Sequence, residues 1–204
     1  LDSYLAAARE GGWEVRLGCP VTSLLREGDR ICGVDTPVGT VRARWTINAA
    51  GGWMNHIAPD LALEAVPCRR HLMVTTPVEA IDPDHPFCWD EPGGFYFRAE
   101  SGGWLVSPCD VEPWDPATAC GVSEQRMVEA AEKAGRFVAG AAELGIAHAW
   151  SGMRTLTTDD RPLVGPDRRV GGLFWVAGLG GHGMTLSAAI GPLAADLLLD
   201  GHTD

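Results

Sequence analysis

The sequence has no excess of basic residues and no long apolar run. Its 204 residues include 16 lysines and arginines against 27 aspartates and glutamates, a formal net charge of −11 at pH 7. No basic patch is available to bind a phosphate backbone or an anionic lipid surface, so nucleic acid is not an expected partner. No apolar run approaches the roughly 20 residues of a membrane-spanning helix, so no span is expected.

Closely paired cysteines and a nucleophile elbow are also missing. The six cysteines are scattered, and neither they nor the histidines have the spacing of a metal site or a redox dithiol. Without a signal peptide, we interpret the cysteines as reduced thiols of a cytoplasmic protein; the alternative is up to three disulfides in a secreted one. No G-x-S-x-G segment occurs, which argues against a serine hydrolase.

The first residues already follow a helical pattern. Leu1, Tyr4, Leu5 and Ala8 fall on one helical stripe, and the chain does not begin with methionine. We therefore expect that an N-terminal part has been removed. At the other end, Gly201 gives the last predicted helix a natural stop.

Alternating polar and apolar residues between turn residues predict many strands. The expected strands are 13–17, 21–25, 30–35, 38–42, 45–48, 67–76, 95–98, 104–107, 146–155 and 173–176. Two further helices are expected, one capped by Ser123 and one from about Gly183 to 200. The chain has no internal repeat and no low-complexity tract.

A glycine-rich turn carries the strongest local signal for a ligand. Buried strand residues up to Ala177 are followed by Gly-Leu-Gly-Gly-His-Gly and then by a helix start at about Gly183. Unpaired amides and the positive end of a helix dipole favour bound negative charge, and glycine lets a flat ring or a phosphate approach the backbone. A tight strand-to-helix turn without any ligand explains the glycines equally well.

Five segments, taken in order, resemble the D-amino-acid oxidase superfamily, which includes glycine oxidase and flavin-dependent D-amino-acid dehydrogenases. They are Thr46–Trp53, Val66–Arg70, Gly94–Arg98 continuing to Ser107–Asp110, Trp150–Gly165, and the glycine-rich turn. Together they cover nearly the whole chain, which makes the resemblance more specific than any one of them.

The resemblance implies a mixed fold of α/β plus α+β type: an incomplete Rossmann-like FAD-binding domain with an antiparallel-sheet substrate domain. Residues 1–63 and 150–204 would belong to the FAD-binding domain, and residues 64–149 to the substrate domain. The family's N-terminal strand, G-x-G-x-x-G turn and helix, which hold the FAD pyrophosphate, have no counterpart at the start of this chain. A separate N-terminal FAD-binding segment or subunit is the partner that this difference suggests.

Cofactor contacts also follow from the resemblance. The backbone around Val21 would meet the adenine of FAD, and Ala50 and Gly51 would lie along the cofactor. At His182 we expect a backbone contribution rather than side-chain catalysis. In the glycine-rich turn, the amides of Gly180, Gly181, His182, Gly183 and Met184 would face the flavin's N1 and C2 carbonyl, and Gly178 is a further cofactor-binding candidate.

Candidate catalytic residues lie on the strands. Arg154 matches the family arginine that clamps the substrate carboxylate through two parallel hydrogen bonds; otherwise it would read as a surface arginine at a strand end. Tyr96 resembles a substrate-binding tyrosine but could equally belong to the core. Arg69 and Arg70 point to opposite faces of their strand, so at most one reaches the site directly, and the sequence does not say which.

The implied activity is FAD-dependent oxidation of a small (D-)amino acid or secondary amine. Hydride transfer to flavin N5 would give an imine that hydrolyses to a 2-oxo acid. The alternative is a truncated, non-catalytic remnant, or a subunit that needs a separate N-terminal FAD-binding partner.

Overall fold

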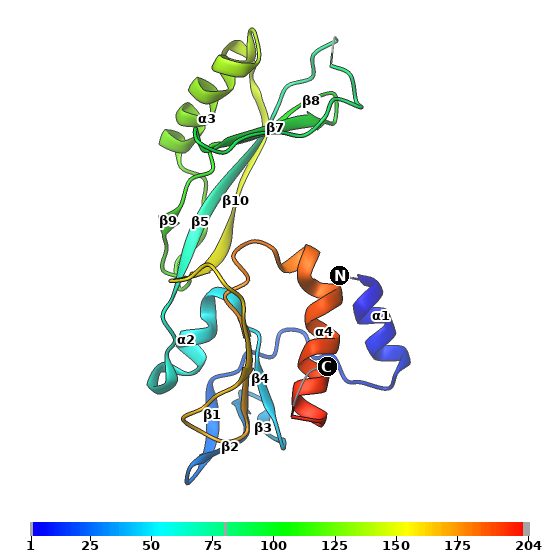
Figure 1. Ribbon diagram of the computed structural model, residues 1–204, viewed down its shortest axis with the longest axis vertical. Helices are drawn as coiled ribbons and strands as arrows, with labels where there is room; N and C mark the ends of the chain where they lie inside the picture. Colours follow the sequence, from blue (N-terminus) through cyan, green and yellow to red (C-terminus); the bar gives the residue numbers. More distant parts are fainter. Residues whose placement is uncertain (1, 80, 202–204) are drawn as a thin grey trace.

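The computed structural model describes residues 2–79 and 81–201, which form four helices and twelve strands (Figure 1). The helices are α1 (Asp2–Glu10), α2 (Met54–Ile57), α3 (Glu124–Phe137) and α4 (Gly183–Leu199), and the 3-10 turns are η1 (Gly51–Trp53), η2 (Pro59–Leu61) and η3 (Ala141–Glu143). The strands are β1 (Ser23–Glu27), β2 (Arg30–Thr36), β3 (Gly39–Arg42), β4 (Thr46–Asn48), β5 (Ala65–Thr75), β6 (Cys88–Asp90), β7 (Phe95–Glu100), β8 (Gly103–Ser107), β9 (Glu112–Pro113), β10 (Ile146–Thr157), β11 (Leu163–Pro166) and β12 (Leu173–Ala177).

These strands form three sheets. The largest is antiparallel, in the order β10-β5-β8-β7-β6, with β9 also paired to β5. A three-stranded antiparallel sheet contains β1, β2 and β3, and a third sheet has the order β11-β12-β4, in which β12 and β4 are parallel. The long pair β5 and β10 connects the part that holds α3 with the part that holds α4 (Figure 1).

Alternation along the strands of the large sheet separates a buried face from an open one. Opposite residues in an antiparallel ladder share a face, so Met73, Val106 and Phe97 lie together. They pack with Ala130 and Ala134 of α3 in one hydrophobic core. We call the opposite side the open face. Its residues include Arg70, Leu72, Val74, Tyr96, Leu105, Trp150, Gly152 and Arg154.

A second core lies around the small mixed sheet. Leu173 and Trp175 of β12 are buried there with Ile31 of β2 and Met54 of α2. The parallel register that pairs Trp175 with Asn48 places the end of β4 beside the end of β12. Gly178 follows β12 directly and Gly51 follows β4 after two alanines, so both glycine segments emerge at the same edge of this sheet.

The observed mixed fold with antiparallel sheets confirms the predicted fold class. The hairpins at 30–42 and 95–107 and the last helix form as predicted. The predicted strand at 13–17 is wrong: Trp13 and Leu17 are 73% and 79% exposed and pair with no strand. Alternation alone does not make a strand when no neighbouring strand accepts its hydrogen bonds. The predicted opening helix forms as α1; on its stripe Leu5 and Ala8 are half-buried and Tyr4 is exposed, and Leu1 lies outside the described residues.

Asp167 joins the small sheet to the segment before β5. Its side chain is 2% exposed and accepts hydrogen bonds from Arg169 Nη2 (2.6 Å) and Trp175 Nε1 (2.9 Å). Arg169 Nη2 also donates to the carbonyl of Leu61 at 2.7 Å. Despite burial, which acts in the opposite direction, the bonds from Arg169 and Trp175 lower the pKa of Asp167 to about 2.

We expect this carboxylate to contribute stability that disappears in acid. Because its folded pKa lies below the ordinary value of 3.8, the contribution is complete above that value and is lost as the pH falls toward 2. The shift corresponds to about 2 kcal/mol of unfolding free energy. Urea unfolding across this pH range should show a shallower loss in Asp167→Asn than in wild type. Asp84→Asn, at an exposed loop position, should retain the wild-type slope.

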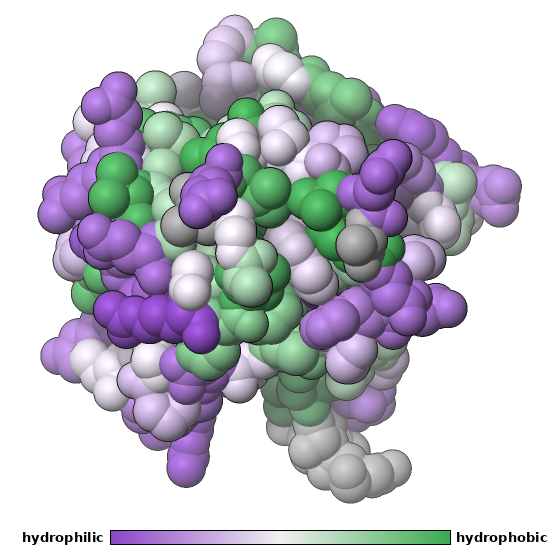
Figure 2. Space-filling model, turned by 90° about the horizontal axis from the view of Figure 1, so that it is seen from above, coloured by the Kyte–Doolittle hydropathy of each residue, from purple (hydrophilic) through white to green (hydrophobic). Residues whose placement is uncertain are grey.

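The surface, the cysteines, the helices and the possible metal ligands give little further indication of function. From above, apolar residues lie near the middle of the visible face with hydrophilic residues around them (Figure 2). All six cysteines are free. Among the described residues, no helix is both long and apolar enough to cross a bilayer, and no group of His, Cys, Asp or Glu side chains could hold a metal ion.

Candidate functional site

A hollow of about 360 Å³ lies where η1, β10 and the turn between β12 and α4 meet. It brings together segments that are more than a hundred residues apart in the sequence. The predicted site residues that line it are Gly51, Arg154, Gly178, Gly180, Gly181, Gly183 and Met184. Met153 and Thr155 of β10, on either side of Arg154, complete this wall.

The floor from β4 is shaped by a buried asparagine. Asn48 ends the strand, and its Nδ2 donates to the carbonyl of Met54 at 3.0 Å. Its Oδ1 accepts from the amide of Ala50 at 3.2 Å. The two bonds lie where the chain turns into η1, and Gly51 lines the hollow whereas Ala50 does not. An ideal Cβ at Gly51 would meet no atom within 4 Å, so the backbone there is open to a ligand.

The turn between β12 and α4 is tied to β10. The amide of Gly180 donates to the carbonyl of Thr155 at 3.1 Å, and the amide of His182 donates to that of Leu179 at 2.8 Å. His182 is the N-cap of α4 but makes no side-chain cap hydrogen bond. The first-turn amides of α4 therefore remain available to an acceptor at the positive end of the helix dipole.

Arg154 lies directly against this turn. An ideal Cβ on Gly181 would come within 2.6 Å of Arg154 Nε and 2.7 Å of Cζ, so the guanidinium occupies the space that any other residue would fill. Among the described residues, no carboxylate lies within ion-pair distance of Arg154. Burial and the nearby Arg70 lower the pKa of Arg154, yet a guanidinium remains charged at neutral pH. An uncompensated cation beside a helix N-terminus favours an anion.

The structure separates the roles of Arg69 and Arg70. Arg69 is buried, pairs with Glu112 at 2.8 Å and stacks over the Trp114 ring at 3.9 Å from the centroid. Its side chain therefore ties β5 to the segment at 112–121 and does not face Arg154. Arg70 lies on the open face, opposite Gly152 and diagonal to Arg154.

Tyr96 also lies on the open face. It is half-buried on β7, and its ring packs against Phe87 with centroids 5.3 Å apart. Its phenol is close enough to influence the pKa of Arg154, which it shifts upward against the larger effect of burial. The tyrosine is therefore not enclosed in the core, one of the two locations that the sequence left open.

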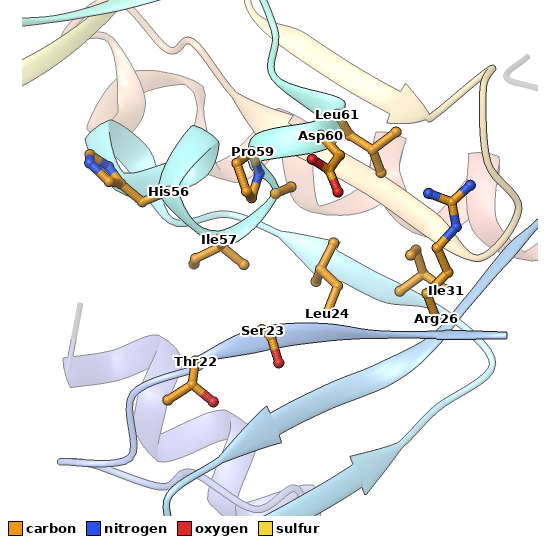
Figure 3. Close-up of a pocket in the computed structure, with 11 residues that line it drawn as sticks. Thr22, Ser23, Leu24, Arg26, Ile31, His56, Ile57, Pro59, Asp60 and Leu61 are labelled. Carbon is orange, nitrogen blue, oxygen red and sulfur yellow. The ribbon is translucent and has the colours of Figure 1, made fainter.

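Besides Ala50, two more of the predicted cofactor contacts lie outside the main hollow. Val21 precedes β1 and adjoins a second hollow of about 250 Å³, between β1 and the α2–η2 segment (Figure 3). His182 is exposed and does not line the main hollow, although its ring Nδ1 would be 3.6 Å from a Cβ on Gly180. The expected backbone role of His182 stays a prediction.

Sequence reasoning missed a buried pair behind the site. His71 and Asp110 are fully buried, and His71 Nδ1 lies 2.8 Å from Asp110 Oδ2. The amide of Ser123 donates to Nε2 at 3.0 Å, so the ring proton is on Nδ1 and points to the carboxylate. His71 and Asp110 are 39 residues apart in the sequence, and no local motif around either residue predicts the contact.

The turn from Gly178 to Gly183 itself has the spacing G-x-G-x-x-G and stands between a strand and a helix. Spacing alone does not make it a dinucleotide-binding fingerprint. That fingerprint belongs to a βαβ unit, so the spacing by itself leaves the turn as a candidate for the flavin contacts predicted from the family.

The comparisons with known proteins agree with this geometry. The family model described as FAD dependent oxidoreductase matches residues 1–197. The chain belongs to the FAD dependent oxidoreductase family. Its family, its fold class and the cofactor of that family, FAD, are thus confirmed.

Two sequence relatives and one solved structure show how much of a family member is present. Human mitochondrial dimethylglycine dehydrogenase is 29% identical over 96% of this chain and 25% of its own length. The D-amino acid dehydrogenase of Paramagnetospirillum magneticum is 30% identical over 95% of this chain and 45% of its own length. The structure of glycine oxidase from Geobacillus kaustophilus superposes with a TM-score of 0.80 at 25% identity. The match covers 97% of this chain and 52% of the glycine oxidase chain. The chain thus spans a quarter to about half of these proteins.

The residues present fit a flavin at the main hollow. Uncapped amides at the start of α4, the open backbone at Gly51 and an uncompensated guanidinium surround one space. These are groups that can hold a flat ring with a polar edge and, next to it, an anionic substrate. The contacts of individual residues with FAD remain predictions.

Proposed function

We propose that this chain carries the substrate side of an FAD-dependent oxidoreductase that oxidises a small amino acid or secondary amine. One observation carries the proposal: Arg154 presents an unpaired, half-buried guanidinium beside the uncapped start of α4, in a hollow lined with glycine. The Arg154 guanidinium and the N-terminal end of α4 are two adjacent positive groups in a partly water-excluded space. Together they favour binding of a carboxylate next to the electron-rich edge of a ring.

In this proposal each group of the chain has a defined task. Arg154 binds the substrate carboxylate through its fork, which fixes the orientation of the neighbouring carbon atom. The amides of Gly181, Gly183 and Met184 hold the pyrimidine edge of the isoalloxazine, where the positive helix end favours negative charge. Bound FAD supplies the hydride acceptor, and the imine product hydrolyses in water to a 2-oxo acid.

The proposed division of the chain follows the two cores. Residues 1–63 and 150–204 belong to the FAD-binding part and residues 64–149 to the substrate part. The core around Ile31 and Leu173 supports the first part, and the core under α3 supports the second. β10 passes through the proposed boundary at residue 150 and runs the length of β5, which makes it a shared element.

The surface of α4 supports an additional FAD-binding segment as partner, whether in the same chain or in a separate subunit. The helix is apolar over most of its length, yet within residues 183–199 only Ala194 is buried. Met184, Leu193 and Leu199 are exposed. Apolar surface of this extent usually marks an interface.

Flavin binding tests the proposal directly. Purified chain should retain added FAD on gel filtration, alone or with a coexpressed FAD-binding segment from a longer relative. Glycine, sarcosine, dimethylglycine or a D-amino acid should then bleach the flavin's visible absorbance without oxygen. Binding only in the presence of the added segment identifies a dependent subunit. If FAD is retained in neither form, the chain is a non-catalytic remnant and the proposal fails.

A further inference from the structure

The open face carries two arginines that can reach one ligand. Arg70 is paired with Gly152 across the β5–β10 ladder, and Arg154 lies two residues further along β10. Side chains in this diagonal relation start about 7–8 Å apart, and an arginine is long enough to close that gap. Arg70 also lowers the pKa of Arg154, as expected for two nearby positive charges.

The charge of Arg70 is held in place but is not neutralised. Its Nε donates to the carbonyl of Asp110 at 3.0 Å, and its Nη2 donates to that of Cys109 at 3.1 Å. Both acceptors are neutral. Within residues 2–79 and 81–201, no carboxylate lies within ion-pair distance of Arg70, so its positive charge stays available to a ligand.

The side chain of Asp110, whose backbone carbonyl accepts from Arg70, is engaged elsewhere. Asp110 Oδ1 accepts from the amide of His71 at 2.9 Å, and Oδ2 accepts from His71 Nδ1 at 2.8 Å. Ser107 Oγ also donates to the carbonyl of His71 at 2.8 Å. The buried histidine thus occupies both oxygens of the Asp110 carboxylate.

The ladder position opposite Arg70 is open to solvent. A guanidinium has five N–H donors, and only two of those on Arg70 are used by the chain. Gly152 is exposed, and an ideal Cβ there would meet no atom within 4 Å. Trp150 flanks this space on the same face of β10.

We propose that Arg70 binds a second acidic group of the substrate, over Gly152, so that the site takes dianionic amino or imino acids in preference to monoanionic ones. This inference rests on the proposed function, in which Arg154 binds the first carboxylate. A dianion compensates both guanidiniums at once, whereas a monoanion leaves one partly desolvated charge without a partner.

Binding of simple carboxylates to the 204-residue chain tests the inference without any flavin. Titrations with acetate, malonate and succinate are followed by NMR shifts of the Gly152 and Gly181 amides at low ionic strength, where screening is weak. The better-fitting dicarboxylate should bind about tenfold or more tightly than acetate, the gain expected from hydrogen bonds between charged groups. The difference should decrease with added salt.

Variants separate this inference from the proposed function. Arg70→Gln should abolish the advantage of the dicarboxylate, whereas Arg98→Gln, an exposed arginine paired with Glu100, should keep it. Dicarboxylates that bind no better than acetate, or an advantage that survives in Arg70→Gln, overturn the inference. If acetate binding disappears in Arg154→Gln, the proposed function stands, whether or not the dicarboxylate advantage depends on Arg70. Acetate binding that persists in Arg154→Gln overturns both.

Discussion

Replacing Arg154 with glutamine in the complete, FAD-loaded enzyme should raise the Michaelis constant about 100-fold while the flavin content stays unchanged. Glutamine keeps much of the length of the side chain but loses the charge and the fork. Two charge-assisted hydrogen bonds to a carboxylate are worth about 3 kcal/mol, which corresponds to this factor. Steady-state kinetics, together with the ratio of flavin to protein absorbance, measures both quantities.

A graded series makes the Arg154 result specific. Arg154→Lys keeps the charge without the bidentate geometry and should fall between wild type and glutamine. Arg98→Gln removes an arginine from a strand of the same sheet, where it pairs with Glu100, and should leave the Michaelis constant unchanged. If Arg154→Gln had the same Michaelis constant as wild type, Arg154 would not contact the substrate.

Local signals in the sequence predicted the elements that frame the site. Glycines after an apolar strand fix a strand-to-helix turn, and this turn forms between β12 and α4 at the predicted residues. Hairpins with clear turn residues, such as the one around Ser101, were also predictable because turn chemistry acts over a few residues. The predicted family brought Gly51, Arg154 and the turn into one hypothesis, and all three line one hollow.

Long-range contacts could not be predicted in the same way. Arg69 and Arg70 have identical side chains, and only the pairing partners of β5 show that one is buried against Glu112 and the other faces Arg154. The failed strand at 13–17 has the same cause. Its residues alternate, but no strand of the described residues pairs with it to complete a ladder.

The contact between Gly181 and Arg154 was likewise hidden, although both residues were predicted to be in the site. Gly181 has a φ of 92°, and a Cβ there would lie within 3 Å of three Arg154 side-chain atoms. Glycine is thus required twice, once by its own backbone conformation and once by the neighbouring guanidinium. Spacing in the sequence reveals the first requirement only.

Gly181→Ala should therefore damage function more than folding. The added methyl group meets the far end of a flexible side chain, so Arg154 can move aside at little cost to the core. The positive φ should lower the unfolding free energy by about 1–2 kcal/mol. Displacement of the guanidinium should raise the Michaelis constant tenfold or more, because a misplaced fork loses at least one charged hydrogen bond. Urea unfolding and steady-state kinetics measure the two effects separately.

Gly191→Ala is the matched control for this substitution. Gly191 lies in the middle of α4, and its ideal Cβ would meet no atom within 4 Å. Alanine should increase the unfolding free energy by about 0.5–1 kcal/mol there and leave the kinetics unchanged. If Gly181→Ala and Gly191→Ala had the same unfolding free energy and the same Michaelis constant, the Arg154 guanidinium would not lie against the turn. The proposed anion site would then lack the guanidinium. A Gly181→Ala protein that loses several kcal/mol of stability without any change in the Michaelis constant would also contradict the assignment, because the strain would then fall on the fold and not on Arg154.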